Sequence, residues 1–197
     1  MTQGKIARES LLTLEAYAKE RPSFRARVLD HKRARTVHLG EHITLVFEDE
    51  LTMRYQIQEM LRIEKTFEEQ GIQDELDAYN PLVPDGSNWK ATMMIQYPDV
   101  EERRQALGRL IGIEDRVWVQ VEGCPKVYAV ADEDLERETA EKTSSVHFLR
   151  FELDAGMRKA LAGGANIRVG VDHPNYRETV DPVPAAVRAS LLKDLKF

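Results

Sequence analysis

The sequence contains a single cysteine, Cys124, among 197 residues. One cysteine excludes a disulfide framework, and it excludes a zinc finger or a cysteine-ligated iron–sulfur cluster built by this chain alone. This cysteine usage is typical of a reducing compartment, so we expect a cytoplasmic protein. Uninterrupted apolar runs are only a few residues long, and the sequence therefore predicts no membrane insertion. Glu9 and Glu15 interrupt the apolar N-terminal stretch, which argues against a secretory signal.

Recognised catalytic and nucleotide-binding motifs are also missing. The chain has no G-x-G-x-x-G, no G-x-x-x-x-G-K-[ST] and no G-x-S-x-G. Its histidines are His31, His38, His42, His147 and His173. None of them forms H-x-H, H-x-x-x-H or H-E-x-x-H, so a metal site would have to be assembled from distant segments.

The composition is that of a globular protein, with 42% hydrophobic residues and a net charge of −6. Strand-like and helix-like segments are mixed along the chain, and few of them form β-α-β units. The pattern predicts one α+β domain over residues 1–197, with a mixed, mostly antiparallel sheet of about six or seven strands and helices packed on it. Residues 1–34 are expected to form a helical N-terminal segment.

Local signals define the first elements. Residues 10–20 predict a short helix with Ser10 as N-cap, and Pro22 predicts the first turn of a second helix. In the two strands that follow, Leu39 and Ile43 lie on the same face only if a three-residue loop, 40–42, joins the strands.

The next helix, predicted over about residues 50–70 with Asp49 as its cap, carries a carboxylate inside its apolar stripe. At 100° per residue Glu64 falls between Ile57 and Phe67. A buried carboxylate needs a partner. Three interpretations remain open: an ion pair with a basic residue, an acid/base or metal-binding role, or a stripe that faces water at this end.

A charged helix is expected over 132–142, before a strand with polar groups on both faces. His147 alternates with apolar residues, whereas Arg150 and Glu152 share the opposite face. Such a strand should be covered on both sides. His147 is either a hydrogen-bonded core histidine or a ligand, and Arg150 and Glu152 are expected in one charge network that could include Glu64.

Two hypotheses for chemistry follow from these residues. In the first, a pocket between the 50–70 helix and the 145–153 strand uses Glu64, His147 and Arg150 for catalysis, with Arg150 as an anion clamp. In the second, a divalent metal is held by a set of four residues: Glu64, His147, Glu152 and His173.

The charge distribution suggests a binding surface. Between Lys19 and Arg35 there are seven basic side chains and two acidic ones, although the whole chain is acidic. The segment is either a solvated, salt-bridged helix face or a docking face for an acidic partner that uses Arg25, Arg27 and Arg33. Phe24 is the one aromatic residue among them, and no nucleic-acid-binding signature accompanies it, which disfavours nucleic acid.

Several stretches together resemble a known bacterial family. They are QIQEMLRIEKTFEEQGIQDELDAYNPLVPDG, GIEDRVWVQVEG followed by YAVADEDLER, EKTSSVHFLRFEL, and GVDHPNYR. The family is catalogued as a domain of unknown function, and its members are commonly encoded beside rubrerythrin-like diiron proteins and a cysteine-rich iron–sulfur oxidoreductase. The resemblance implies an accessory role in bacterial redox or oxidative-stress metabolism, with a diiron or iron–sulfur protein as partner. It implies no catalytic residues.

Overall fold

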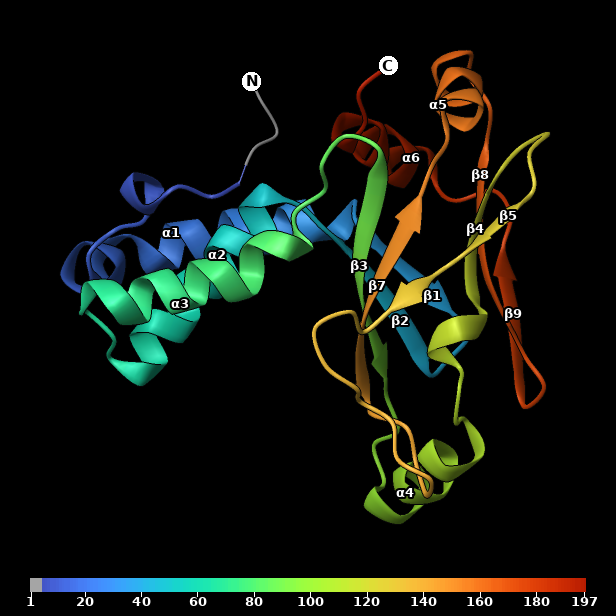
Figure 1. Cartoon of the computed structure of the whole chain (residues 1–197), viewed down its shortest axis with the longest axis horizontal. Helices are drawn as coiled ribbons and strands as arrows, with labels where there is room; N and C mark the ends of the chain where they lie inside the picture. Colours follow the sequence, from blue (N-terminus) through green and yellow to red (C-terminus); the bar gives the residue numbers. More distant parts are fainter. Residues whose placement is uncertain (1–4) are drawn as a thin grey trace.

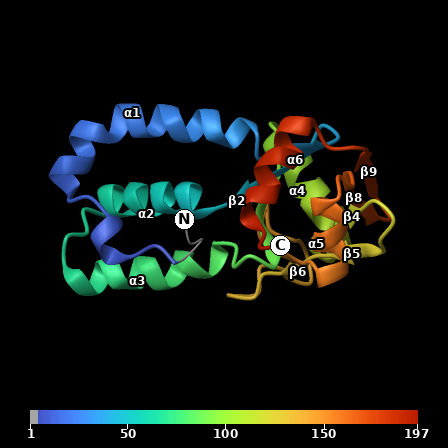
Figure 2. The ribbon, with the colours of Figure 1, turned by 90° about the horizontal axis from the view of Figure 1, so that it is seen from above.

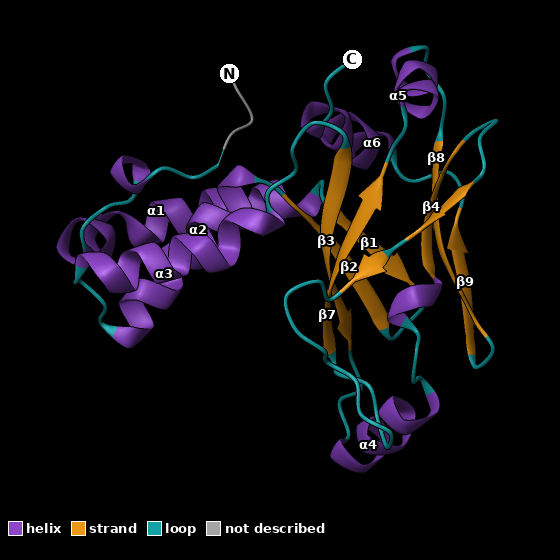
Figure 3. Cartoon of the chain, in the orientation of Figure 1, coloured by secondary structure: helices purple, strands orange, loops and turns teal. Residues whose placement is uncertain are grey.

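Two antiparallel sheets form one side of the molecule, and a group of helices extends from them on the other (Figures 1 and 3). The computed structural model describes residues 5–197. The five-stranded sheet has the order β1-β2-β3-β7-β6, and the four-stranded sheet has the order β5-β4-β8-β9. The strands are β1 (Thr36–Leu39), β2 (Ile43–Glu48), β3 (Asn88–Ile95), β4 (Val117–Val121), β5 (Lys126–Tyr128), β6 (Val130–Ala131), β7 (Val146–Glu152), β8 (Ile167–His173) and β9 (Tyr176–Val180).

Six α-helices accompany the sheets within residues 5–197. They are α1 (Leu14–Arg33), α2 (Glu50–Glu64), α3 (Glu69–Tyr79), α4 (Val100–Arg109), α5 (Ala155–Ala162) and α6 (Ala185–Leu191). The α+β class is therefore confirmed, with the strands divided between two sheets. None of these helices combines the length and the apolar character that crossing a bilayer requires.

Helices α1, α2 and α3 lie side by side and form an arm that projects from the sheets (Figures 1 and 2). The predicted break at Pro22 is wrong, because α1 continues through it from its N-cap Thr13. Pro22 is exposed, whereas Tyr17, Phe24 and Val28 are buried on the same helix. Packing of this apolar side stabilises one continuous helix despite the missing backbone N–H of proline.

The β1–β2 hairpin has the predicted register. Leu39 pairs with Ile43, and Val37 pairs with Leu45 across the three-residue loop. Gly40 in this loop has φ +67°, a left-handed conformation that glycine adopts without steric cost. The register puts the apolar residues of both strands on the face that packs in the core.

The main core lies between the sheets. Leu45, Phe47 and Phe151 face it from the five-stranded sheet, and Val119 and Val169 face it from the four-stranded sheet. All of β2 is buried, because the arm covers the end of its opposite face. The chain from 126 to 131 passes from the four-stranded sheet as β5 into the five-stranded sheet as β6 and joins the two.

The charged helix predicted over 132–142 is absent, and this segment is a loop. Its first residue, Asp132, has a left-handed backbone with φ +48°, which a helix start does not allow. Arg137 folds back to bind Asp132 and Asp134. At the other end, the backbone N–H of Thr143 donates to the carbonyl oxygen of Leu107. Local ion pairs and this tertiary hydrogen bond therefore replace the helical hydrogen bonds.

Candidate functional site

The side chain of His147 lies at the centre of a buried polar cluster. The residue has no exposed surface, and it lies on the core face of β7 with Leu149 and Phe151, as predicted. Its Nδ1 is 2.5 Å from Oδ2 of Asp132, and its Nε2 is 2.9 Å from Oγ1 of Thr143. Because the Asp132 carboxylate can only accept, Nδ1 donates to it, and Nε2 faces the other side of the cluster.

Glu114 forms that other side. It lies in a single helical turn, Glu114–Arg116, directly before β4, and it is 7% exposed. Its Oε2 lies 3.8 Å from Nε2 of His147 and accepts a hydrogen bond from Oγ1 of Thr143 at 3.2 Å. Burial raises the pKa of Glu114 above its usual value, and the neighbouring Glu138 carboxylate raises it further.

The loop over 132–145 closes this cluster. Oδ1 of Asp132 accepts from the backbone N–H of Phe148 at 2.9 Å and from Arg137 at 3.2 Å. The Arg137 guanidinium also lies over the Phe148 ring, 4.7 Å from its centre. Glu138 accepts from the backbone N–H of Gly112 at 2.5 Å. Side chains of the loop thus fix both the loop and the orientation of the Asp132 carboxylate.

The cluster has the donors of a metal site. Within residues 5–197, Glu114, Asp132 and His147 are the group whose ligand atoms approach one another closely, all within 4.8 Å. An imidazole nitrogen with two carboxylate oxygens suits iron, zinc and manganese. The same groups could also pass a proton between a carboxylate and the imidazole.

Of the four predicted metal ligands, only His147 belongs to this cluster. Glu64 is the last residue of α2 and is exposed. Among residues 5–197 it has no ion-pair partner, so the apolar stripe of α2 faces water at this end, which was one of the open interpretations. Met53 and Ile57 are buried on the earlier turns of the helix. The helix ends at Lys65, in a left-handed conformation, several residues before the predicted end.

Arg150 and Glu152 form the predicted charge network, with Glu133 in place of Glu64. Arg150 donates to both oxygens of Glu133, at 2.7 and 2.8 Å, and to Glu152 at 2.6 Å. Hydrogen bonds to these carboxylates raise the pKa of Arg150 above its usual value, and the bond to Glu133 contributes most. The guanidinium that was considered as an anion clamp is therefore bound to two anions of the chain itself.

His173 lies elsewhere, at the end of β8. Its Nε2 is 3.0 Å from the carbonyl oxygen of Ile111, and its Nδ1 accepts from the backbone N–H of Asn175 at 3.2 Å. It is buried, and both ring nitrogens are satisfied by backbone groups. The structure does not bring it or Glu152 to His147.

A cleft of about 260 Å³ lies where the predicted pocket was expected, between α2 and β7. Met53 and Gln56 of α2 line one wall, and Val146 and Phe148 of β7 line another. The side chains predicted to act there do not line it, because His147 points to the opposite face of the sheet and Glu64 lies beyond the cleft. Its charged residues are Lys32 and Glu48.

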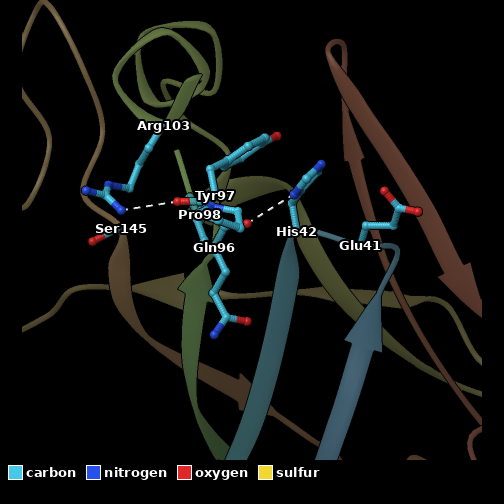
Figure 4. Close-up of a pocket in the computed structure, with 8 residues that line it drawn as sticks. Glu41, His42, Gln96, Tyr97, Pro98, Arg103 and Ser145 are labelled. Atoms are coloured by element: carbon cyan, nitrogen blue, oxygen red, sulfur yellow. Dashed lines mark hydrogen bonds between the residues drawn. The ribbon is translucent and has the colours of Figure 1, made fainter. Parts of the chain in front are cut away.

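A larger hollow, of about 760 Å³, lies beside the β1–β2 turn (Figure 4). The His42 ring stacks on Tyr97 with 3.8 Å between ring centres. Arg103 donates to the carbonyl oxygen of Tyr97 at 3.1 Å, and His42 bonds the carbonyl oxygen of Gln96 at 3.0 Å. These side chains are satisfied by the backbone of the same wall, so the hollow presents few free polar groups.

The residues proposed for partner binding are all on α1, which belongs to the arm. Arg25, Arg27 and Arg33 are exposed on α1. Arg33 pairs with Asp30 at 3.4 Å, and the Arg27 guanidinium lies 4.9 Å from the centre of the Phe24 ring.

Comparison with known proteins identifies the family. The family model described as "Protein of unknown function (DUF3501)" matches residues 5–195. The chain belongs to the DUF3501 family. A chain of known structure resembles it closely: the crystal structure of a novel protein of unknown function from Burkholderia pseudomallei K96243 has 58% sequence identity and a TM-score of 0.93, and the match covers 98% of this chain and 100% of that one. No curated protein matches the sequence.

Sequence reasoning about this DUF3501 chain found one cluster residue and missed Glu114, Asp132 and Thr143. Asp132 was assigned to a helix, and its position directly after the short apolar strand β6 was the signal that could have singled it out. Glu114 had no comparable signal, because its approach to His147 depends on how the two sheets pack. Thr143 is only four residues before His147, but it contacts the histidine through the conformation of the loop, which the sequence pattern did not indicate.

Proposed function

We propose that this protein binds a divalent transition-metal ion at Glu114, Asp132 and His147. One observation carries the proposal: an imidazole nitrogen and two carboxylate oxygens, from three separate segments, all lie within 4.8 Å of one another. Separate segments are what a metal site requires in a chain that lacks the short histidine motifs.

The charge of the cluster supports a cation. Three carboxylates, those of Glu114, Asp132 and Glu138, gather around His147, and of these only Asp132 forms an ion pair with an arginine or lysine side chain, that of Arg137, among residues 5–197. Carboxylates that crowd together in a buried site repel one another. A divalent cation would offset this repulsion, and the strands on both sides would hold its ligands in place.

Metal titration of the purified protein tests the proposal. After removal of bound metals with a chelator, calorimetric titration with zinc, manganese and, without oxygen, iron(II) should show one site. Glu114→Gln, Asp132→Asn and His147→Ala should each weaken binding by about tenfold or more. Glu64→Gln and His42→Ala are controls that should bind as the wild type does. Equal affinity in the wild type and the three cluster variants would contradict the proposal.

A second candidate function is that of an accessory protein in a bacterial redox system. Its support is the exposed group Arg25, Arg27 and Arg33 on the projecting arm, together with the genomic neighbours that the family resemblance implies. The partner would be an acidic diiron or iron–sulfur protein of the cytoplasm, steered to α1 by its charge.

Binding to such a partner should depend on these arginines and on salt. A triple variant, Arg25→Glu, Arg27→Glu and Arg33→Glu, should lose at least about tenfold in affinity in surface-plasmon measurements at low ionic strength. Lys19→Glu, at the other end of the helix, is the control. Unchanged affinity in the triple variant would exclude α1 as the docking face, and the absence of any complex would exclude the accessory role.

A further inference from the structure

The cleft between the arm and the five-stranded sheet holds a buried carboxylate with a free oxygen. Glu48, at the end of β2, is 4% exposed. Its Oε1 accepts from Oγ1 of Thr92 at 2.7 Å, whereas its Oε2 is buried and has no hydrogen-bond partner among residues 5–197. A buried carboxylate oxygen without a donor is costly and uncommon in native structures. It therefore indicates a missing partner.

The register of the strand directs Glu48 to the cleft. Phe47 packs in the core between the sheets, so Val46 and Glu48 project from the other face. Thr92, which binds Glu48, lines the cleft on the neighbouring strand β3. Glu48 is thus on the opposite face of the sheet from His147, and the cleft is separate from the acid–histidine cluster.

A cation without a partner lines the same cleft. Lys32 lies in the last turn of α1 and is half-buried. Within the described part of the chain, its ammonium group has no ion pair or hydrogen bond, and it does not pair with Glu48. Its backbone is fixed, because its carbonyl oxygen accepts from Thr36 at 2.8 Å. The cleft therefore presents one uncompensated charge of each sign.

We infer that this cleft binds a small zwitterion, with its ammonium group at Oε2 of Glu48 and its carboxylate at Lys32. Such a ligand supplies the missing donor and compensates both charges, whereas a simple amine or a simple acid would compensate only one. A volume of about 260 Å³ limits the ligand to the size of an amino acid.

The remaining walls favour an apolar body between the two charges. Met53, Met94 and Phe148 line the cleft beside them. Methionine side chains adapt to irregular apolar shapes. Gln56 and the Tyr79 hydroxyl add hydrogen-bonding groups to the wall of the cleft. Burial raises the pKa of Tyr79, so its hydroxyl stays protonated and able to donate.

Three related probes separate the two charges. Calorimetric titration would compare L-leucine, which carries both charges, with L-leucinamide, which lacks the carboxylate, and N-acetyl-L-leucine, which lacks the ammonium group. L-methionine and L-phenylalanine extend the test to other apolar bodies. The zwitterions should bind, and each single-charge derivative should bind at least about tenfold more weakly, because one charge of the cleft is then left uncompensated.

Two variants should change this preference in opposite ways. Glu48→Gln, which keeps an oxygen for Thr92, should remove the preference for leucine over N-acetyl-leucine. Lys32→Ala should remove the preference for leucine over leucinamide. Lys19→Ala and Glu64→Gln are exposed controls that should behave as the wild type does. Because Glu48 lies away from the acid–histidine cluster, metal titration of Glu48→Gln should be unchanged, which also shows that the variant is folded.

The inference fails if none of these zwitterions binds at millimolar concentration. It also fails if they bind with the same affinity to the wild type, Glu48→Gln and Lys32→Ala, or if the single-charge derivatives bind as well as leucine.

Discussion

At the scale of single residues, the acidic side chains of this protein differ according to what surrounds them. Glu64 ends α2 in solvent, whereas Glu59, five residues earlier, is largely buried at the contact with α1. Glu59 accepts from Arg21 at 2.7 and 2.9 Å and from the Tyr17 hydroxyl at 2.8 Å. Sequence periodicity singled out Glu64 because it considers one helix, and the closest partners of Glu59, Arg21 and Tyr17, come from another.

Loss of the Glu59 charge should destabilise the arm above acidic pH. Hydrogen bonds from Arg21 chiefly lower the pKa of Glu59 to about 2. A folded-state pKa below the unfolded value stabilises the fold above about pH 4.5, and this contribution is lost as the pH falls towards 2. Glu59→Gln should therefore lose about 1–2 kcal/mol of unfolding free energy at neutral pH, which lowers Tm by a few degrees.

Thermal unfolding of the wild type and Glu59→Gln from pH 7 to pH 2 would test this. The difference in Tm should shrink as the pH falls through this range. Glu64→Gln should stay within about 0.5 kcal/mol of the wild type at neutral pH. If the difference in Tm between Glu59→Gln and the wild type does not change with pH, the stabilising role of the ionised Glu59 carboxylate is contradicted.

At the scale of elements, patterns that depend on neighbouring residues were predicted correctly. The β1–β2 hairpin register follows from alternation and loop length, and the N-cap of α2 follows from residue type over a few positions. The predicted N-cap of the first helix, Ser10, is wrong, because α1 begins after Thr13. Asp49 forms a capping box with Thr52, as its residue type favours. The predictions were wrong for elements whose conformation depends on distant contacts. Proline at position 22 does not end α1, and the charged segment 132–142 is not helical.

One such distant contact joins β4 and β8. Trp118 pairs with Gly170 across the two strands, and Lys126 lies 3.9 Å from the centre of its ring system. A Cβ at position 170 would overlap the Trp118 ring and lie 2.9 Å from the carbonyl oxygen of Glu178. The glycine thus gives the indole ring room to lie flat on the sheet.

Gly170→Ala should therefore displace the Trp118 ring and destabilise the four-stranded sheet. Overpacking of this kind costs about 1–3 kcal/mol. Urea unfolding followed by tryptophan fluorescence would measure the loss, and the emission of the folded state should change. Gly156→Ala, at an exposed position of α5, is the matched control and should not lower stability appreciably. If Gly170→Ala is as stable as the wild type, the Trp118 ring can adopt another position without cost, and the prediction is contradicted.

At the scale of the whole molecule, Arg35 connects the arm, the five-stranded sheet and the C-terminal segment. The residue is 1% exposed. It donates to the carbonyl oxygen of Phe47 at 2.7 Å, to Oγ of Ser190 at 3.1 Å and to the Asp194 carboxylate at 2.5 Å. Hydrogen bonds from one guanidinium thus fix the base of α1 against two other parts of the chain.

Arg35→Ala should be the most destabilising of these substitutions. It leaves the Asp194 carboxylate buried without its partner, which costs about 3–5 kcal/mol. For a chain of this length the loss corresponds to a decrease in Tm of about 6–20 °C. Arg35→Lys should lie between the wild type and Arg35→Ala, because an ammonium group cannot make the same set of bonds. Arg25→Ala, at an exposed position of α1, is the control.

The candidate sites also belong to this scale, and this is why sequence reasoning recovered them only in part. The acid–histidine cluster brings together residues 114, 132 and 147, and the cleft combines residues from α1 to β7. Alternation in β7 correctly placed His147 in the core, and the position of the cleft between α2 and β7 was predicted. The identity of the groups that meet there depends on packing that no local pattern encodes.

The strand segment from 126 to 131 has a consequence for how the protein unfolds. β5 is an edge strand of one sheet and β6 is an edge strand of the other. Because the two strands are consecutive in the chain, detachment of either edge strand should also disturb the other sheet. Destabilisation of the four-stranded sheet by Gly170→Ala should thus also destabilise β6, the strand that leads directly to Asp132. The two sheets should unfold in a single cooperative transition, and the contacts of the acid–histidine cluster should be lost in that same transition.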